Sequence, residues 1–249
     1  MELGISGKVA IVTGAARGIG KACALGLALE GVCLVVNDLD EEAGQETVRS
    51  IQDLGAQSFF LKGDVSDEDD VRELFVTAYK KFGHIDILIN NAGISPKLPF
   101  DAIRAADFDH VVKTNLRSNF LCSQKAIFYM KDNGWGRIVN LSSLAGVHGG
   151  IHSAAHYSAT KAAIIGVTKT LAKQMGKYNI TVNCVAPGRI DTAMTRMLSQ
   201  EQLSEVIERI PLKRLGTIEE VADVIVFLAS ERSAYITGTC VEILGGYTG

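Results

Sequence analysis

The feature that most constrains the fold is an alternation of short apolar runs with longer amphipathic stretches along the chain. The short runs are rich in Val, Ile and Leu and are apolar at successive positions, which is typical of parallel strands buried on both faces. The alternation predicts an α/β fold in which a doubly wound parallel sheet carries helices on both faces. The seven strands are expected at residues 9–13, 33–37, 58–61, 85–89, 137–141, 181–185 and 240–243.

Composition restricts the classes of partner. A chain of 249 residues with 47% hydrophobic residues can build one large core, so a single domain over residues 1–249 is expected. A net charge of −3 without a long basic run argues against nucleic acid as a partner, because phosphate binding needs clustered Lys and Arg. A small-molecule substrate fits this balance better.

The cysteines and the apolar runs indicate the compartment. Five cysteines are scattered without CxxC spacing, which favours a reducing environment over a disulfide framework or a zinc site. No apolar run approaches the roughly 18 residues that span a bilayer, and no secretory leader pattern precedes the first strand. We therefore expect a soluble, cytoplasmic protein that does not enter a membrane.

A glycine-rich turn, Thr13-Gly-Ala-Ala-Arg-Gly-Ile-Gly20, closes the first predicted strand and opens a helix. Glycines in this context let the backbone approach a pyrophosphate at the helix N-terminus, which makes the expected fold Rossmann-like. The spacing Gly-x-x-x-Gly-x-Gly is not the commoner Gly-x-Gly-x-x-Gly, and a turn that only allows close packing is the alternative. The candidate cofactor residues of the turn are Gly14, Arg17, Gly18, Ile19 and Gly20.

Asp38 ends the second predicted strand, about 20 residues beyond the turn, where a carboxylate can accept both adenosine ribose hydroxyls. Its neighbour Leu39 belongs to the same candidate site. The alternative role for Asp38 is a helix N-cap, because Asp38-x-x-Glu41 fits a capping box, although Asp40 could cap instead. Arg17 could reach a 2′-phosphate, but that phosphate would face the Asp38 carboxylate, so NAD is expected ahead of NADP.

Tyr157 and Lys161 stand four residues apart, so on a helix they share one face and the ammonium can favour the phenolate. Lowering a tyrosine pKa from about 10 to about 7 requires about 4 kcal/mol, whereas a helix terminus contributes about 0.3 to 1 kcal/mol. Lys161 and the positive ring of an oxidised nicotinamide are therefore expected to supply most of this change.

Given these motifs, the chain resembles the classical short-chain dehydrogenases/reductases over essentially its full length. The family's Asn-Asn-Ala-Gly segment corresponds to residues 90–93, its Asp-Val pair to residues 64–65, and its Pro-Gly-x-x-x-Thr motif to residues 187–192. A departure is Leu244-Gly-Gly where many members carry Asp-Gly-Gly, which puts a local turn contact in doubt. The resemblance implies further cofactor contacts at Asp64, Val65, Asn91, Ala92, Gly93, Tyr157, Lys161, Pro187, Gly188, Ile190 and Thr192.

The resemblance also implies a catalytic tetrad of Asn115, Ser143, Tyr157 and Lys161. In that scheme Tyr157 is the general acid/base and Ser143 hydrogen-bonds the substrate oxygen. Asn115 holds a water that connects Lys161 to solvent. A homotetramer built through the long helices that carry Asn115 and Tyr157 is implied as well.

Three histidines at a spacing of four, His148, His152 and His156, raise the possibility of a metal site. Gly149 and Gly150 weaken a helix there and no carboxylate or cysteine accompanies the set, so no metal is expected. His148 or His152 is instead a candidate to bind a polar group of the substrate, with an exposed loop histidine as the alternative.

Two further local structures are expected. Ser66 followed by Asp69 resembles a capping box for the third helix. Residues 189–211, rich in Met and Leu after the sixth strand, are expected to form a small helical lid over the substrate.

Three functions remain open at this point. The first is an NAD-dependent oxidoreductase that interconverts a secondary alcohol and a ketone on a small polar substrate. The alternative is an NADPH-dependent reductase of 3-oxoacyl thioesters on acyl-carrier protein. The basic positions that dock this carrier in similar enzymes fall at Gly134 and Tyr178, although Lys131 and Lys177 are adjacent. The third, a non-catalytic nucleotide-binding protein, predicts an eroded tetrad, and the tetrad is intact.

Overall fold

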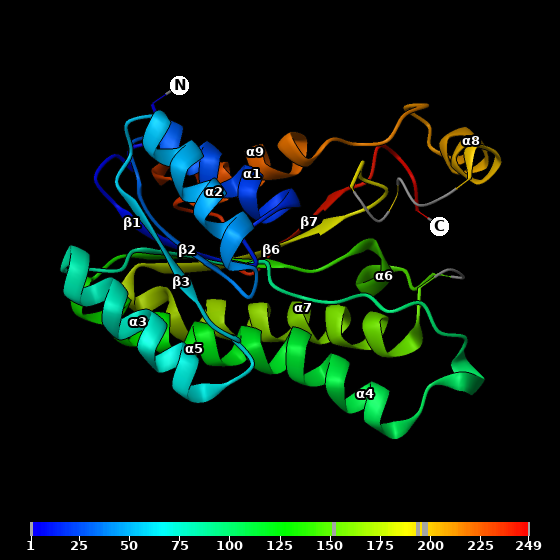
Figure 1. Ribbon diagram of the computed structural model, residues 1–249, viewed down its shortest axis with the longest axis horizontal. Helices are drawn as coiled ribbons and strands as arrows, with labels where there is room; N and C mark the ends of the chain where they lie inside the picture. Colours follow the sequence, from blue (N-terminus) through cyan, green and yellow to red (C-terminus); the bar gives the residue numbers. More distant parts are fainter. Residues whose placement is uncertain (1, 151–152, 193–194, 196–198, 249) are drawn as a thin grey trace.

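The centre of the protein is a parallel sheet with the strand order β3-β2-β1-β4-β5-β6-β7 (Figure 1). The computed structural model describes residues 2–150, 153–192, 195 and 199–248. All seven predicted strands are confirmed, with small shifts at their ends. They are β1 Val9–Thr13, β2 Cys33–Asp38, β3 Ser58–Lys62, β4 Ile87–Asn90, β5 Gly136–Leu141, β6 Ile180–Pro187 and β7 Cys240–Ile243.

Helices cover the sheet on both faces, which confirms the doubly wound Rossmann-like arrangement. Figure 1 shows α1, α2 and α9 on one face and α3, α5 and α7 on the other. Each layer buries its own apolar cluster against the sheet. The α-helices are α1 Gly18–Leu29, α2 Glu41–Asp53, α3 Glu68–Phe82, α4 Ala105–Val112, α5 Ser118–Asn133, α6 Leu144–Val147, α7 Ala155–Met175, α8 Gln200–Arg209 and α9 Ile218–Leu228.

Shorter helical pieces complete the chain. A π-helical segment, η2 Lys113–Arg117, joins α4 to α5 without a break. The 3-10 turns are η1 Phe100–Ala102, η3 Gly176–Tyr178 and η5 Glu231–Ser233. No helix in the described part of the chain is both long and apolar enough to cross a bilayer.

The strand order fixes where a ligand can bind. β1 pairs with β2 on one side and with β4 on the other, so the direction of winding changes between β1 and β4. In an open parallel sheet, ligands bind outside the carboxyl ends of the strands at such a switch point. The glycine turn, Asp38 and Asn91 lie at the carboxyl ends of β1, β2 and β4.

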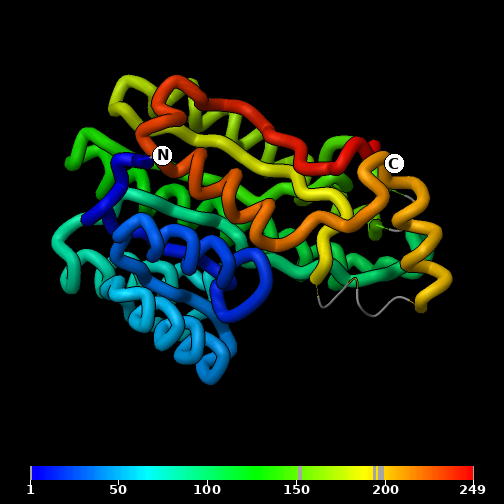
Figure 2. The backbone as a smooth tube through the Cα atoms, turned by 90° about the horizontal axis from the view of Figure 1, so that it is seen from above, coloured from blue at the N-terminus to red at the C-terminus, as the bar shows by residue number. Residues whose placement is uncertain are grey.

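The segment after β6 also lies at the carboxyl ends of the strands. Seen from above in Figure 2, α8 lies near the C-terminal end of the chain. The Leu212 backbone N–H donates to the carbonyl of Gly245, 3.2 Å away, which joins the segment after α8 to the turn after β7. The predicted lid thus contains a helix, and its closing motion stays a prediction.

The predicted cap of the third helix is wrong. The N-cap of α3 is Asp67, whose Oδ1 accepts hydrogen bonds from the backbone N–H groups of Asp69 and Asp70 at 2.9 and 3.3 Å. Ser66 is buried one residue earlier, and its N–H donates to Asp64 instead. Asp67 is a better N-cap than Ser66 because its carboxylate accepts from two backbone N–H groups and interacts favourably with the positive end of the helix dipole.

Candidate active site

The glycine-rich turn brings backbone close to backbone at the carboxyl end of β1. Gly14 and Gly18 have φ values of 63° and 57°, which disfavour side chains. A Cβ on Gly20 would lie 2.3 Å from the Gly14 carbonyl oxygen, whereas one on Gly18 would meet nothing within 4 Å. The turn is therefore tightly packed at Gly20 and open at Gly18.

The first turn of α1 begins at this open side. Arg17 is its N-cap residue but makes no side-chain capping bond, and the first turn carries no acidic residue. The leading N–H groups of a helix need partners and attract anions. An uncapped helix start behind an open glycine turn fits the pyrophosphate of a dinucleotide.

Asn91 braces the turn from β4. Its Nδ2 donates to the carbonyl oxygens of Thr13 and Gly14 at 3.0 and 2.8 Å. The Thr13 hydroxyl in turn accepts from the backbone N–H groups of Asn91 and Ala92, both at 3.1 Å. These bonds hold the strand ends of β1 and β4 in one rigid unit.

Asp38 ends β2 and does not cap α2, since Asp40 is the N-cap and accepts from the Ala43 N–H at 3.1 Å. The Asp38 carboxylate accepts from the N–H of Ala16 at 3.0 Å and from the N–H groups of Leu39 and Asp40 at 2.8 and 3.1 Å. A carboxylate has about four acceptor positions, so one remains for a ligand hydroxyl.

Arg17 is paired with Asp40 rather than with Asp38. The guanidinium donates from Nη2 to the Asp40 carboxylate, and both side chains are exposed. The arginine that could attract a 2′-phosphate is therefore already partnered. Leu39 beside this pair is 63% exposed, a flat apolar surface next to Asp38.

Asp64 and Val65 follow β3, on the same edge of the sheet. The Asp64 N–H donates to the Asp70 carboxylate at 2.7 Å, and its own Oδ1 accepts from the Ser66 N–H at 2.9 Å. Val65 is buried. These bonds fix the Asp-Val pair at the start of α3.

Tyr157 and Lys161 lie on one face of α7, and the Lys161 Nζ is 5.8 Å from the centroid of the Tyr157 ring. Lys161 is buried and donates to the Leu141 carbonyl at 2.6 Å, at the end of β5. Burial lowers the pKa of Lys161 to about 8. Burial raises the pKa of Tyr157, and a hydrogen bond with Ser143 opposes that rise.

The expectation that Lys161 lowers the Tyr157 pKa is not met within the polypeptide alone. Burial disfavours the Tyr157 phenolate by more than the hydrogen bond with Ser143 favours it, so the pKa stays raised. The Lys161 ammonium donates to the Leu141 carbonyl instead of to the phenol.

Asn115 is buried in η2 and bonds the backbone of Ile94 from both sides. Its Oδ1 accepts from the Ile94 N–H at 2.8 Å, while its Nδ2 donates to the Ile94 carbonyl at 2.9 Å and to the Thr160 hydroxyl at 3.2 Å. Both amide hydrogens are used, so a water at Asn115 would have to donate to it, and the expected water role of Asn115 stays a prediction. A Cβ on Gly93 would lie 3.6 Å from the Lys161 Nζ, so the braced segment runs past the lysine.

Ser143 follows β5 and is the N-cap of α6, where its Oγ accepts from the Ala145 N–H at 3.2 Å. Ser142 ties this segment to α7, because its hydroxyl donates to the Lys161 carbonyl at 2.8 Å. Gly146 allows the close approach: a Cβ there would lie 2.6 Å from the carbonyl carbon of Lys161. The four tetrad residues thus come from η2, the β5 end and α7, and converge.

The Pro187–Thr192 segment leaves β6 beside β7. The Gly188 N–H donates to the Ile243 carbonyl at 3.0 Å. Ile190 forms an isolated parallel bridge with Gly216, whose bonds use the Arg189 carbonyl and the Asp191 N–H. The N–H of Ile190 itself is not used by that bridge, and the Thr192 hydroxyl lies 3.4 Å from that of Thr195.

The histidines do not share one helical face. The Nε2 of His148 lies 2.6 Å from the Glu242 carboxylate on β7, whereas His156 is buried on α7. His152 lies outside the described residues. Within the described ranges, no three His, Cys, Asp or Glu side chains are grouped to hold a metal. The substrate role of His148 stays a prediction.

Comparison with known proteins identifies the family. Residues 14–248 match a family model described as enoyl-(acyl carrier protein) reductase. The chain is 40% identical over 247 residues to a 3-oxoacyl-[acyl-carrier-protein] reductase of Aquifex aeolicus, covering 99% of each. Among solved structures, levodione reductase superposes with a TM-score of 0.93 at 34% identity, covering 97% of each chain. A candidate gluconate dehydrogenase of Agrobacterium tumefaciens has a TM-score of 0.95 at 32% identity, covering 100% of this chain and 99% of that one.

These relatives are reductases and dehydrogenases, and the matches run over nearly the whole chain. The strand order, the glycine turn after β1 and the Tyr157–Lys161 face agree with that kinship. The chain belongs to the short-chain dehydrogenase/reductase family and is an oxidoreductase of CH–OH groups that uses a nicotinamide cofactor.

Proposed function

We propose that the protein is an NAD-dependent oxidoreductase that interconverts a secondary alcohol and a ketone on a small polar substrate. The observation that carries the choice of NAD is the state of Asp38. Its carboxylate stands at the β2 end and is free of helix capping, because Asp40 caps α2 and also pairs with Arg17. The 2′-phosphate of NADP would therefore be repelled by the Asp38 carboxylate, and the Arg17 guanidinium that could attract it is already paired with Asp40.

The residues of the site fit the cofactor. The uncapped start of α1 and the open side of Gly18 would receive the pyrophosphate, and the remaining acceptor position of Asp38 would take a ribose hydroxyl. The Ile190 N–H, which the bridge to Gly216 does not use, and Thr192 would contact the nicotinamide amide. When bound, the nicotinamide ring accepts or donates the hydride.

The tetrad residues supply the proton chemistry in this proposal. Tyr157 takes the proton from the substrate hydroxyl at its phenolic oxygen and returns it in the reverse direction. Ser143 hydrogen-bonds both that phenol and the substrate oxygen, which aligns the two. Lys161 supplies positive charge near the Tyr157 ring. Asn115 fixes the Ile94 backbone relative to Thr160 on α7.

The first prediction concerns cofactor choice. The wild type should use NAD at least about tenfold more efficiently than NADP, a difference of about 1.4 kcal/mol. Asp38→Ala should level or invert that preference in kcat/KM, because it removes a charge-assisted bond to the ribose and the repulsion against a 2′-phosphate.

Asp40→Ala is the matched control for this experiment. It frees the Arg17 guanidinium while leaving the Asp38 carboxylate, so NADP use should improve without loss of NAD use. The helix cap is lost with it, at a cost of about 1 kcal/mol in stability. A wild type that prefers NADP would contradict the proposal and return Asp38 to a backbone-bracing role.

A second candidate function is reduction of 3-oxoacyl thioesters with NADPH. It is favoured by the names of the 40% identical relatives. Lys131 and Lys177 also flank Tyr178, with their ammonium groups 4.7 and 5.1 Å from the ring centroid, and together offer positive charge to an acidic carrier. Initial rates across sugars, polyols, hydroxy acids, cyclic alcohols and acyl thioesters separate the two candidates.

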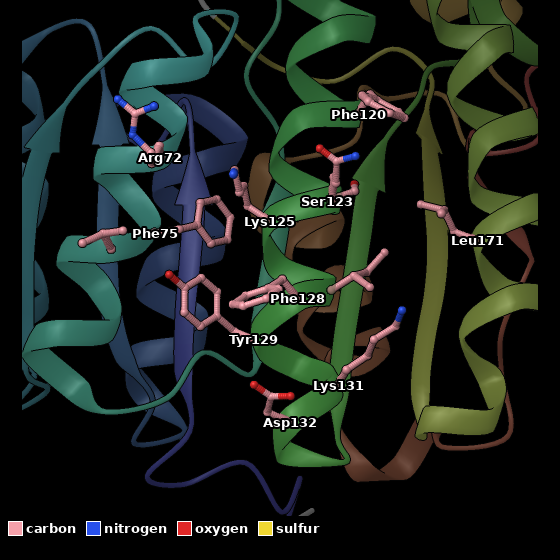
Figure 3. A pocket seen from close by; sticks show the side chains of 13 residues that line it. Arg72, Phe75, Phe120, Ser123, Lys125, Phe128, Tyr129, Lys131, Asp132 and Leu171 are labelled. Atoms are coloured by element: carbon pink, nitrogen blue, oxygen red, sulfur yellow. The ribbon is translucent and has the colours of Figure 1, made fainter.

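A homotetramer is proposed through the long helices that carry Asn115 and Tyr157. On the outer face of α5, Phe120 and Phe128 are 53% and 65% exposed, an unusual pair for a solvent-facing helix. Figure 3 shows them beside a groove to which α3 contributes Phe75 and α7 contributes Leu171. We propose that a second copy of the chain covers this face.

This proposal predicts a change in assembly. The double variant Phe120→Asp and Phe128→Asp should sediment as a smaller species than the wild type, because each new carboxylate would be buried in an apolar contact. Leu29→Asp is the control, since Leu29 is 69% exposed on α1, on the opposite face of the sheet. Equal sedimentation of the double variant and the wild type would contradict the assembly through α5.

A further inference from the structure

Two cysteines stand opposite each other at the edge of the sheet. Cys184 on β6 and Cys240 on β7 are Cα partners in the parallel register. Partners in neighbouring strands are about 4.8 Å apart and their side chains point to the same face. A disulfide requires Cα atoms about 4.4 to 6.8 Å apart, so the backbone already meets this condition.

The two thiols also interact. Cys184 is buried, with its Sγ 3.6 Å from the Thr239 carbonyl oxygen, whereas Cys240 on the edge strand is partly exposed. The adjoining Cys184 thiol lowers the pKa of Cys240, whereas Cys240 and burial raise the pKa of Cys184. The positive charge of Lys169 on α7 acts on both in the direction of the thiolate. Glu242 opposes ionisation of Cys240, but its lowered pKa and partial exposure make Cys240 the more accessible and more readily ionised thiol of the pair.

We propose that Cys184 and Cys240 are a reversible redox pair, which forms a disulfide between β6 and β7 when a hydroperoxide oxidises Cys240. The inference is independent of the function proposed above. None of the tetrad residues takes part in it.

The chemistry proceeds in two balanced steps. The Cys240 thiolate attacks the terminal peroxide oxygen, an S–O bond forms as the O–O bond breaks, and the departing alkoxide, or hydroxide in the case of hydrogen peroxide, takes up a proton to give an alcohol or water. Cys184 then attacks the Cys240 sulfur, so that an S–S bond forms, the S–O bond breaks, and the leaving hydroxide takes the Cys184 proton to give water. Two thiols are oxidised and one hydroperoxide is reduced. A dithiol reductant reverses the disulfide by exchange.

The other three cysteines are not placed for this reaction. Cys23 and Cys122 are buried on α1 and α5, and burial raises the pKa of each. Cys33 on β2 is partly exposed, but burial raises its pKa too. In the register Cys33 lies opposite Val9. These positions serve as internal controls.

The test counts thiols in the folded full-length protein treated with hydrogen peroxide and then denatured. The wild type should fall from five free thiols to three, lose the mass of two hydrogen atoms, and return to five with dithiothreitol. A digest without reductant should yield one linked peptide pair that contains Cys184 and Cys240. Cys33→Ser should lose two thiols in the same way, whereas Cys240→Ser should form no intramolecular disulfide.

Either of two results would overturn the proposal. The first is a wild type that keeps five thiols, or only gains oxygen at Cys240, at peroxide concentrations that oxidise an unfolded sample fully. The second is a disulfide that persists in Cys240→Ser or joins a different pair in the digest.

Discussion

Tyr157→Phe should lower kcat by about 10² to 10⁴-fold, the usual contribution of a positioned general acid or base. The substitution removes the phenolic oxygen that carries the proton and keeps the ring that packs on α7. Only the hydrogen bond with Ser143 is lost, so the free energy of unfolding should change by about 1 kcal/mol. The affinity for NAD should stay within a few fold of the wild type.

Single-turnover rates with NAD and isothermal titration of the cofactor measure these two effects separately. Ser143→Ala is the companion variant, because the Ser143 bond lowers the pKa of Tyr157 while burial raises it. Without that bond, the rise of kcat/KM with pH for alcohol oxidation should move to higher pH. Tyr157→Phe that retains more than about 1% of the wild-type kcat would exclude Tyr157 as the acid/base group.

The layers of the fold were predictable because they follow from local pattern. Runs that are apolar at successive positions are typical of strands in a covered parallel sheet, and all seven strands lie where the pattern indicates. The convergence of Ser143 with Tyr157 and Lys161 was also predictable from the chain order, since β5 ends and α7 begins at the same edge of the sheet. Chain order and strand direction carry that much information.

The π-helical segment around Asn115 was not predictable from local pattern. Its cause is tertiary, because the Asn115 amide bonds the Ile94 backbone on one side and Thr160 on the other. π-Bulges occur frequently at functional sites, and the extra residue directs the side chain out of the ordinary helical ladder. The sequence signal was only the identity of Asn115, not its geometry.

The missed pairings join residues far apart in the sequence. His148 lies against Glu242, and Arg17 pairs with Asp40. Each depends on which strand ends are neighbours, and on competition among several nearby carboxylates such as Asp38 and Asp40. The periodicity of apolar residues predicts where a strand lies, but it does not predict the side-chain rotamers that decide which carboxylate pairs with Arg17.

Lys161→Met should abolish turnover and weaken NAD binding together, because one ammonium serves both the phenol of Tyr157 and the nicotinamide ribose in the proposed site. Loss of kcat by about 10²-fold or more is expected, since a charge near the reacting atoms acts in a water-poor environment. Unchanged NAD affinity in a titration would count against the dual role. The variant also removes the bond to the Leu141 carbonyl, so an effect on stability must be separated from an effect on catalysis.

The pH dependence of unfolding makes that separation. Burial lowers the pKa of Lys161 from 10.5 to about 8, so between these values the unfolded chain binds a proton that the folded chain has released. The cost of burying the charge is fully present below about pH 8 and is relieved as the pH rises to 10.5, by about 3 kcal/mol in all. The unfolding free energy of the wild type minus that of Lys161→Met should therefore increase across this window, measured by urea titration at each pH. Every other titrating group is common to both proteins and cancels, whereas the lost Leu141 bond adds only a constant. If the difference between the two unfolding free energies stays constant or falls from pH 8 to 10.5, burial does not lower the pKa of Lys161.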